Sequence, residues 1–306
     1  MADTCVEMRT FVQVVEAGSL AAAGRSLGLS TAVVSRRLAG LEQRLGTRLV
    51  HRSTRNLSLT DEGARYRQRC EQILADIETA EAEALRGTGS AVGVLRITTT
   101  VAFADRLAPL LARFAGEHPT LSIHLHASDD RINLVEDGID LAVRFGRLAE
   151  SSLIAKRLAP NRRVICAAPA YLRAHGYPRV IEDLASHRCI VMGEPPVGEW
   201  RFADGRNVRV GGRLSCNEGR TAHQWALAGA GLVLKSIWDV ADDLAAGRLV
   251  TVLDRAPMPV ADIHALYAHR RHLAPRVRLC LDFLQRELGE LAVRLGIESA
   301  PASGVS

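Results

Sequence analysis

Apolar and polar positions alternate with a helical period through the first 45 residues, which serines and glycines divide into three short helices. Gly18 ends a helix over residues 4–17, and Gly28 ends a second helix because glycine readily adopts the left-handed conformation that follows a helix. Ser19 and Ser30 precede the second and third helices, where a serine hydroxyl can accept an unpaired backbone N–H. Two short helices joined by a tight turn are typical of a helix-turn-helix.

The third predicted helix, which extends to residue 45, has two different faces. Apolar residues recur on the face expected to pack on the first two helices: Val34, Leu38, Leu41 and Leu45. The opposite face is small or polar: Ala32, Ser35, Arg36, Ala39, Gly40 and Gln43. The major groove of DNA admits a helix whose outer face is not bulky, and arginine is the commonest specific donor to guanine there. The alternative is that the arginines only keep a surface solvated.

A short hairpin is predicted after the third helix. Leu49 and Val50 begin one strand, and Leu57 and Leu59 alternate with a serine in the next. The residues between them are turn-like: Ser53, Thr54, Arg55 and Asn56. Such a hairpin is a wing, and Arg52 and Arg55 near its tip suit the DNA backbone or the minor groove.

A long helix is predicted to follow the hairpin, capped by Thr60 and favoured by Asp61 and Glu62 at its positive end. Its apolar or small residues follow steps of four and three: Tyr66, Cys70, Ile73, Ile77, Ala80 and Ala84. This spacing, about 3.5 residues on average, favours a dimer seam. The alternative is an amphipathic helix packed on its own domain. Residues 87–93 are a predicted flexible linker.

From residue 94 onward, predicted strands and helices alternate. The strands are expected at 94–100, 121–127, 139–145, 162–168, 188–192, 208–216, 231–235, 248–253 and 262–268. The helices are expected at 103–118, 131–138, 169–175, 218–229, 238–245 and 275–291. This alternation predicts mainly parallel sheets covered by helices on both faces. About two hundred residues is large for one compact unit and favours two similar lobes.

The distribution of charge along the chain indicates the kind of partner that it binds. The whole chain carries a net charge of +5, but residues 25–69 contain ten arginines against three carboxylates and so carry +7, which leaves −2 elsewhere. A basic segment on a nearly neutral remainder favours an anionic partner such as nucleic acid. A solvated basic face is the alternative.

Other motifs narrow the class of protein. The sequence contains no G-x-S-x-G, P-loop or zinc motif, so we expect no catalytic residues, no metal and no cofactor. The six cysteines form no C-x-x-C pair and are expected to be reduced thiols. The chain has no run of 18 apolar residues and no signal-peptide pattern, which predicts no membrane span and a cytoplasmic location. An enzyme and a free solute-binding protein are the alternatives to a DNA-binding protein.

Three stretches resemble the LysR-type transcriptional regulators. They are FVQVVEAGSLAAAGRSLGLSTAVVSRRLAGLEQRLGTRLVHRSTRNLSLTDEG, LIAKRLAPNRRVICAAPAYLRAHG and WALAGAGLVLKSIWDVADDLAAGRLVTVL. The resemblance implies a mainly-α winged helix-turn-helix, a dimerising linker helix and an α/β two-lobed effector domain similar to periplasmic binding proteins. The expected bounds are 3–61 for the DNA-binding domain, 62–92 for the linker helix, 93–296 for the effector domain and 297–306 for a disordered tail. Within the effector domain we expect lobe I at about 93–160 and 268–296, and lobe II at about 161–267.

The same resemblance implies which residues contact double-stranded operator DNA. They are Ser30, Thr31, Ala32, Ser35, Arg36 and Arg37 on the third helix, and Arg52, Ser53, Thr54 and Arg55 on the wing. The family often has glutamine where this chain has Thr31 and Arg37. We therefore expect the base preferred at Thr31 to differ from that of relatives, while Arg37 can contact DNA or serve only solubility.

The effector is expected between the two lobes. Thr98, Thr99 and Thr100 end a strand and begin a helix, where hydroxyls and free N–H groups favour an anion. The resemblance places the effector near Thr99, Thr100, Val101, Arg144, Phe145 and Asn217. A guanidinium such as Arg144 suits a carboxylate, so we expect a small organic acid, aromatic acids included. Alternatively, the threonines only cap the helix and Arg144 faces solvent. The resemblance also implies a homodimer through the linker helix and a homotetramer.

Overall fold

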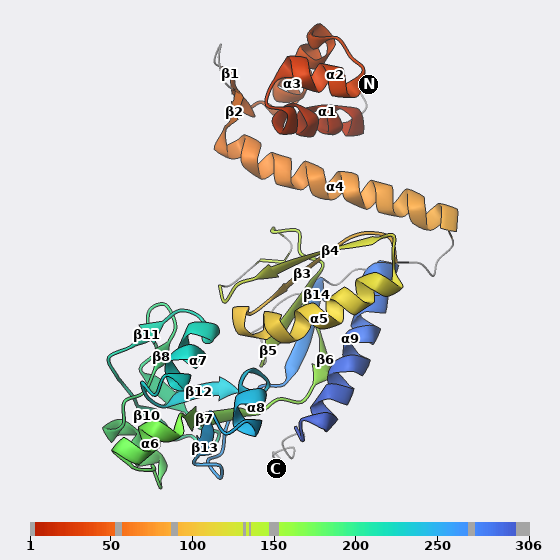
Figure 1. Ribbon diagram of the computed structural model, residues 1–306. Coiled ribbons are helices and arrows are strands. Elements are labelled where there is room, and N and C mark those ends of the chain that lie inside the picture. Colours follow the sequence, from red (N-terminus) through yellow and green to blue (C-terminus); the bar gives the residue numbers. More distant parts are fainter. Residues whose placement is uncertain are drawn as a thin grey trace. The chain divides into compact units, whose positions relative to one another are not determined.

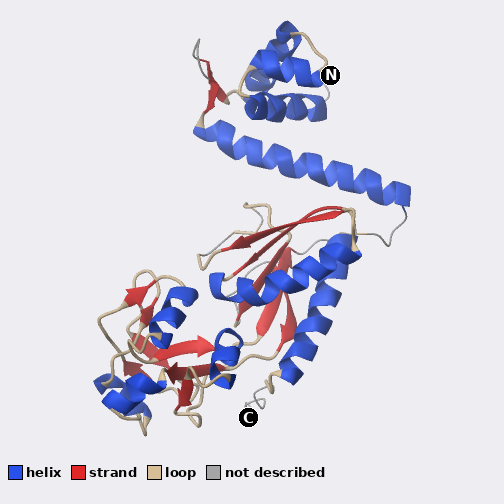
Figure 2. Ribbon diagram, in the orientation of Figure 1, coloured by secondary structure: helices blue, strands red, loops and turns tan. Residues whose placement is uncertain are grey.

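The computed structural model describes residues 4–52, 57–86, 91–130, 133–134, 136–146, 153–268 and 273–297 (Figure 1). The chain divides into two compact units, Met1–Val94 and Leu95–Ser306. The first unit contains helices and a small hairpin, whereas the second combines sheets with covering helices (Figure 2). No helix among the described residues combines the length and the apolar character needed to cross a membrane.

The first unit begins with the three predicted helices, which are α1 (Thr4–Ala17), α2 (Leu20–Leu27) and α3 (Thr31–Leu45). The hydroxyls of Ser19 and Ser30 accept backbone N–H groups at 3.1 and 3.3 Å, so both predicted N-caps are confirmed. Gly28 ends α2 with a φ of 65°, which confirms the predicted turn between α2 and α3. Another glycine, Gly24, lies where a Cβ would come within 2.7 Å of the carbonyl oxygen of Leu29.

The core of the first unit comes from all three helices and from the residues that follow them. Its buried members are Phe11, Val14, Ala23, Val34, Leu38, Leu41, Leu49, Val50 and Cys70. The apolar row predicted on α3 is therefore buried as far as Leu41, whereas Leu45 at the end of the helix is 36% exposed. The opposite face of α3 is left outside this core.

A buried carboxylate connects α3 to the predicted wing. The wing consists of β1 (Val50–Arg52) and β2 (Leu57–Leu59), which pair in antiparallel fashion. The Oε1 atom of Glu42 accepts the backbone N–H of Leu49 at 2.9 Å and that of Val50 at 3.3 Å. Because Glu42 lies on α3 and is buried, these bonds fix the start of β1 relative to that helix.

The long helix α4 (Asp61–Arg86) is capped as predicted, since the hydroxyl of Thr60 accepts the N–H of Gly63 at 2.9 Å. The first two members of the predicted dimer seam pack inside this unit. Cys70 is fully buried, and the ring of Tyr66 lies 5.7 Å from that of Phe11. For these two residues the alternative of a helix packed on its own domain is correct. Further along α4, Ile73 is 42% exposed.

The second unit begins with a five-stranded sheet that defines the first lobe. Its strands are β3 (Gly93–Thr99), β4 (Leu121–Ala127), β5 (Leu141–Phe145), β6 (Leu153–Ala159) and β14 (Ile263–Ala268), in the order β4-β3-β5-β14-β6. Helices α5 (Val101–Glu117) and α9 (Pro275–Arg294) pack on this sheet. The strand predicted at 262–268 is β14 and belongs to the first lobe. The chain therefore re-enters the first lobe at residue 263, and not at about residue 268 as expected. Strand β6 was not predicted.

The second lobe is built on a three-stranded sheet in the order β12-β7-β13. Its strands are β7 (Arg163–Ala167), β12 (Val233–Ser236) and β13 (Val250–Val252), and its helices are α6 (Pro169–His175), α7 (Gly219–Leu227) and α8 (Ile237–Ala245). The lobe also contains a 3-10 helix, η1 (Ile181–Ser186), and four short strands, β8 (Val191–Met192), β9 (Glu199–Arg201), β10 (Asn207–Arg209) and β11 (Ser215–Cys216). Figure 1 shows the lobe around β7 and β12.

The prediction of mainly parallel sheets is wrong. Strand β3 is parallel to β5, but β14 is antiparallel to β5 and β6, and β12 and β13 are antiparallel to β7. The chain leaves the first sheet along β6 and returns along β14, so these neighbours must run in opposite directions. The helix predicted at 131–138 is also wrong for the described residues of that segment, which form turns.

All six cysteines are free thiols. Four of them are buried, and burial raises the pKa of Cys166, Cys189 and Cys280 to about 12. These side chains therefore act as small apolar core residues.

Gly63 tests the packing of α4 on the first unit. A Cβ at this position would overlap the carbonyl oxygen of Leu49, whereas a Cβ at Gly40 would lie 3.9 Å from its nearest neighbour, the Glu7 carboxylate. We expect Gly63→Ala to destabilise the first unit by about 1–3 kcal/mol, because overpacking forces the backbone apart. Gly40→Ala is the matched control and should be neutral or slightly stabilising. Thermal unfolding followed by circular dichroism measures both, and equal midpoints would contradict this packing.

Candidate functional site

The N-terminal half of α3 presents a small and basic surface. Its exposed residues are Ser30, Thr31, Ala32, Arg36 and Ala39, and Ser35 is half-buried among them. The guanidinium of Arg36 makes no hydrogen bond or ion pair with the described residues. Among the described residues, this surface therefore offers short hydroxyls at the start of α3 and the unpaired guanidinium of Arg36 in its second turn.

The neighbouring arginine has a different environment. Arg37 is half-buried, and its Nη1 atom lies 3.5 Å from the hydroxyl of Thr10 on α1, to which it donates a hydrogen bond. Arg37 therefore contributes to the packing of α3 on α1. The sequence left the role of Arg37 open between DNA contact and solubility, and it gave no sign of the contact with Thr10, which joins residues 27 positions apart.

The wing contributes less to the described surface. The backbone of Arg52 lies in β1 opposite Leu57. Ser53, Thr54 and Arg55, which were also predicted to contact DNA, lie outside the described residues.

A cavity of about 610 Å³ lies between the two lobes of the second unit, and we call it the cleft. Three of the six predicted effector residues line it, namely Thr100, Phe145 and Asn217. The first lobe also contributes Asp129, and the second lobe contributes Asn161, Arg163, Lys235 and Asp239, among others. The cleft therefore receives polar groups from both lobes.

The other predicted effector residues, Thr99, Val101 and Arg144, do not line the cleft. Thr99 is fully buried, and its hydroxyl donates to the carbonyl of Val143 at 3.0 Å. The Arg144 guanidinium donates to the carbonyl of Ser128 at 2.7 Å and to the hydroxyl of Thr98 at 3.3 Å. Burial lowers the pKa of Arg144, which the nearby carboxylates oppose. Arg144 thus supports the loop after β4 and does not reach into the cleft.

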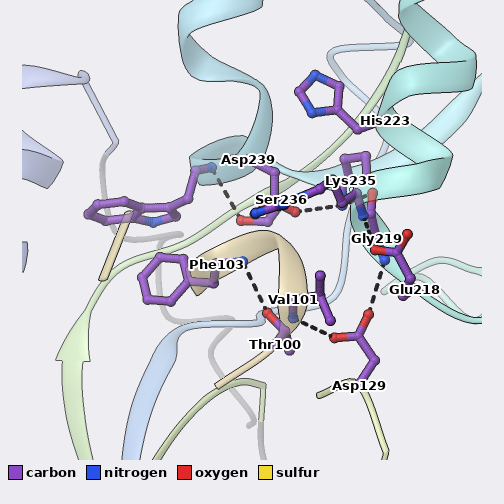
Figure 3. Close-up of polar contacts among 12 residues, drawn as sticks. Thr100, Val101, Phe103, Asp129, Glu218, Gly219, His223, Lys235, Ser236 and Asp239 are labelled. Atoms are coloured by element: carbon purple, nitrogen blue, oxygen red, sulfur yellow. Dashed lines mark hydrogen bonds and ion pairs between the residues drawn. The ribbon is translucent and has the colours of Figure 1, made fainter. Parts of the chain in front are cut away.

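The anion predicted at the start of α5 is a carboxylate of the chain itself. Asp129 accepts the backbone N–H of Val101 through Oδ1 and that of Gly219 through Oδ2, each at 3.0 Å (Figure 3). Val101 begins α5 in the first lobe and Gly219 begins α7 in the second. Helix N-termini carry partial positive charge, so a single carboxylate satisfies two of them and joins the lobes.

Further polar contacts hold the lobes together beside this bridge. The Arg106 guanidinium on α5 lies 2.8 Å from the Asp242 carboxylate on α8 and donates to the carbonyl of Trp238 at 3.1 Å. Asp105 on α5 also forms an ion pair with Arg220 on α7. Helix α5 therefore contributes the cation to one ion pair with the second lobe and the carboxylate to the other.

Two cations line the second-lobe wall of the cleft, and they differ in what they bind. The buried Lys235 ammonium lies 2.7 Å from Asp239 and donates to the carbonyl of Gly219 at 3.0 Å (Figure 3). Arg163 makes no side-chain hydrogen bond or ion pair among the described residues. Burial lowers the pKa of the Arg163 guanidinium, and the charge of Asp239 opposes this. The donors of Arg163 are therefore available to a ligand.

Sequence reasoning missed Asp129, Arg163 and Lys235. Lys235 carried a signal, because it interrupts the apolar run LVLKS. A charged residue inside a buried strand requires a partner, which here is Asp239. Asp129 carried none, since its second bond joins residues 90 positions apart.

The Asp129 bridge can be tested by substitution. We expect Asp129→Ala to destabilise the second unit by about 1–3 kcal/mol, because two backbone N–H groups lose their acceptor. Asp130→Ala is the matched control. The Asp130 carboxylate accepts the hydroxyl of Ser128 at the surface, and this hydrogen bond stays within the first lobe. Thermal unfolding of the full chain distinguishes the variants. If Asp129→Ala unfolded at the wild-type temperature, the bridge would not hold the lobes.

Comparisons with known proteins cover both units. The family model of the bacterial regulatory helix-turn-helix protein, lysR family, matches residues 6–64, and the LysR substrate binding domain matches residues 88–289. The HTH-type transcriptional regulator DmlR of Escherichia coli (strain K12) is 35% identical over 300 residues, which span 96% of this chain and 97% of DmlR. The HTH-type transcriptional regulator CrgA of Neisseria meningitidis serogroup B is 36% identical over 288 residues, spanning 92% of this chain and 96% of CrgA.

Solved structures agree with these relatives. The structure of CrgA from Neisseria meningitidis, a LysR-type transcriptional regulator, matches with a TM-score of 0.60 at 34% identity and covers 94% of this chain and all of that one. The full-length structure of AphB, a virulence activator of Vibrio cholerae, matches with a TM-score of 0.56 at 28% identity, over 92% of this chain and 98% of AphB. The predicted winged helix-turn-helix and effector domain are confirmed. The chain therefore belongs to the LysR family of transcriptional regulators, and is a DNA-binding transcription factor with an effector-binding domain and not an enzyme.

Proposed function

We propose that this regulator reads operator DNA mainly through Arg36 and responds to a small organic acid that binds Arg163 in the cleft. The observation that carries the DNA part is the exposed face of α3, where Arg36 has no partner among the described residues. Such a regulator acts in the cytoplasm, where the DNA is.

The neighbours of Arg36 on α3 support contact with the major groove. Ala32 and Ala39 are exposed and small, so the helix can approach base edges closely. Ser30, Thr31 and Ser35 would donate to phosphates or bases beside it. Arg37 has a secondary role, because its hydrogen bond to Thr10 restrains it. Arg52, Ser53, Thr54 and Arg55 of the wing would add sequence-independent contacts to the DNA backbone.

The contrast between the two arginines gives a test of DNA recognition. We expect Arg36→Ala to weaken binding to the upstream region of its own gene by about 5- to 150-fold, which corresponds to about 1–3 kcal/mol for a lost base contact. Arg37→Ala should lose less affinity but unfold at a lower temperature. Fluorescence anisotropy with operator and with scrambled DNA at fixed salt measures both. Wild-type operator affinity in Arg36→Ala would contradict the proposed reading.

The effector part rests on the free donors of Arg163. A planar guanidinium can form two charge-assisted hydrogen bonds with a carboxylate. Lys235 is less available, because Asp239 and Gly219 already bind its ammonium. The helix N-termini beside Thr100 are also less available, because the Asp129 carboxylate already accepts the backbone N–H groups of Val101 and Gly219. Thr100, Phe145 and Asn217 remain as neighbours of the ligand in the cleft.

Two copies of the chain would associate through α4 beyond the residues buried in the first unit. Ile73 is exposed and Ile77 is half-buried, and they lie four residues apart on one face of the helix. We propose a homodimer along this part of α4, assembling further into a homotetramer. The remaining members of the seam, Ala80 and Ala84, have side chains outside the described ones.

Isothermal titration calorimetry of the full chain tests the effector site with benzoate, succinate and butyrate as probes. We expect at least one acid to bind the wild type, and Arg163→Gln to weaken that binding at least about tenfold through loss of a charge-assisted contact. Arg162→Gln is the matched control, because the exposed Arg162 precedes Arg163 and does not line the cleft. Equal binding by both variants, or no binding of any of the three acids to the wild type, would contradict the proposal.

A further inference from the structure

A second cavity, of about 450 Å³, lies within the second lobe, and we call it the side pocket. Four residues line both the side pocket and the cleft: Arg163, Met192, Leu234 and Pro259. Because the two cavities share these walls, they adjoin each other along these four residues, of which Arg163 alone is charged. None of the expected effector residues lines the side pocket.

The far wall of the side pocket is mainly apolar. Ile190 and Trp200 are buried there, and Val197 is 56% exposed at its rim. Two charged residues of β9, Glu199 and Arg201, also contribute, but they pair with each other at 3.4 Å and are exposed. The side pocket is therefore apolar inside, and the two charges at its edge neutralise each other.

Arg163 is the cation at the junction of the two cavities. Its guanidinium has no partner among the described residues, and the residue is half-buried. A ligand whose carboxylate binds Arg163 can extend in either direction. On the first-lobe side it would meet Asp129 and the polar groups around the helix N-termini, whereas on the other side it would meet Met192 and Trp200.

We propose that the side pocket binds the apolar tail of the effector, so that the ligand is an amphipathic monocarboxylate such as a medium-chain alkanoate or an arylalkanoate. This inference rests on the proposed binding of the carboxylate by Arg163. Removal of each methylene from water strengthens binding about fourfold, which makes the length of the tail a measurable determinant of affinity. An acid with a second carboxylate in place of the tail would have to desolvate that charge against apolar walls.

The experiment is a calorimetric series on the full chain with butyrate, hexanoate, octanoate and 4-phenylbutyrate. We expect the affinity of the wild type to rise with tail length until the pocket is filled. Val197→Trp would fill the pocket from its exposed rim, and Val197→Glu would place a charge beside the tail. Both variants should lower octanoate affinity at least about tenfold and leave butyrate affinity within about twofold.

Val180→Trp is the matched control, because Val180 is 53% exposed on the second lobe and lines neither cavity. It should behave as the wild type throughout the series, and circular dichroism verifies that each variant is folded. Acids that require Arg163 but bind equally at every tail length would overturn the side-pocket proposal and leave the proposed effector site standing. The same holds if both Val197 variants keep the wild-type dependence on tail length. If no acid of the series binds the wild type, the side-pocket proposal fails, and if benzoate and succinate do not bind either, the proposed effector site fails with it.

Discussion

The carboxylate of Asp129 connects the first turns of two helices that belong to different lobes, and the geometry of the cleft depends on this contact. Its two oxygens accept the N–H groups of Val101 and Gly219 at the same distance, 3.0 Å. Arg144 supports the loop that carries Asp129 through the carbonyl of Ser128. The backbone N–H groups of Val101 and Gly219 at these two helix N-termini are therefore already bound to a carboxylate of the chain. A carboxylate ligand is left with Arg163, whose donors have no partner among the described residues.

A buried carboxylate also positions the elements of the DNA-binding unit. The Glu42 carboxylate binds the backbone of Leu49 and Val50, so the wing is fixed to α3 by hydrogen bonds to a buried side chain. Gly63 then allows α4 to approach Leu49 without a Cβ between them. In both units, acceptors contributed by acidic side chains set where one element lies on another. Arg36, on the outer face of α3, makes no such internal bond with the described residues.

Local signals were sufficient to predict the DNA-binding unit. Ser19, Ser30 and Gly28 act on neighbouring backbone groups within a few residues, so their pattern in the sequence is enough to place α2 and α3. The dimer seam predicted on α4 was wrong for its first two members, because spacing alone does not distinguish packing on α1 from packing on a second copy. Tyr66 and Cys70 pack in their own unit.

Sequence reasoning was weaker for the cleft, where the decisive contacts are long-range. Thr100, Phe145 and Asn217 line the cleft as the resemblance implied, yet Arg144 turned out to bind Ser128. The return of β14 to the first sheet depends on pairing with β6 over more than 100 residues. The most direct test of the account is a crystal structure of the full chain with its tightest-binding carboxylic acid. We predict the ligand carboxylate within hydrogen-bond distance of the Arg163 guanidinium, with Asp129 still on Val101 and Gly219. A ligand carboxylate bound to those two N–H groups, with Asp129 displaced, would contradict it.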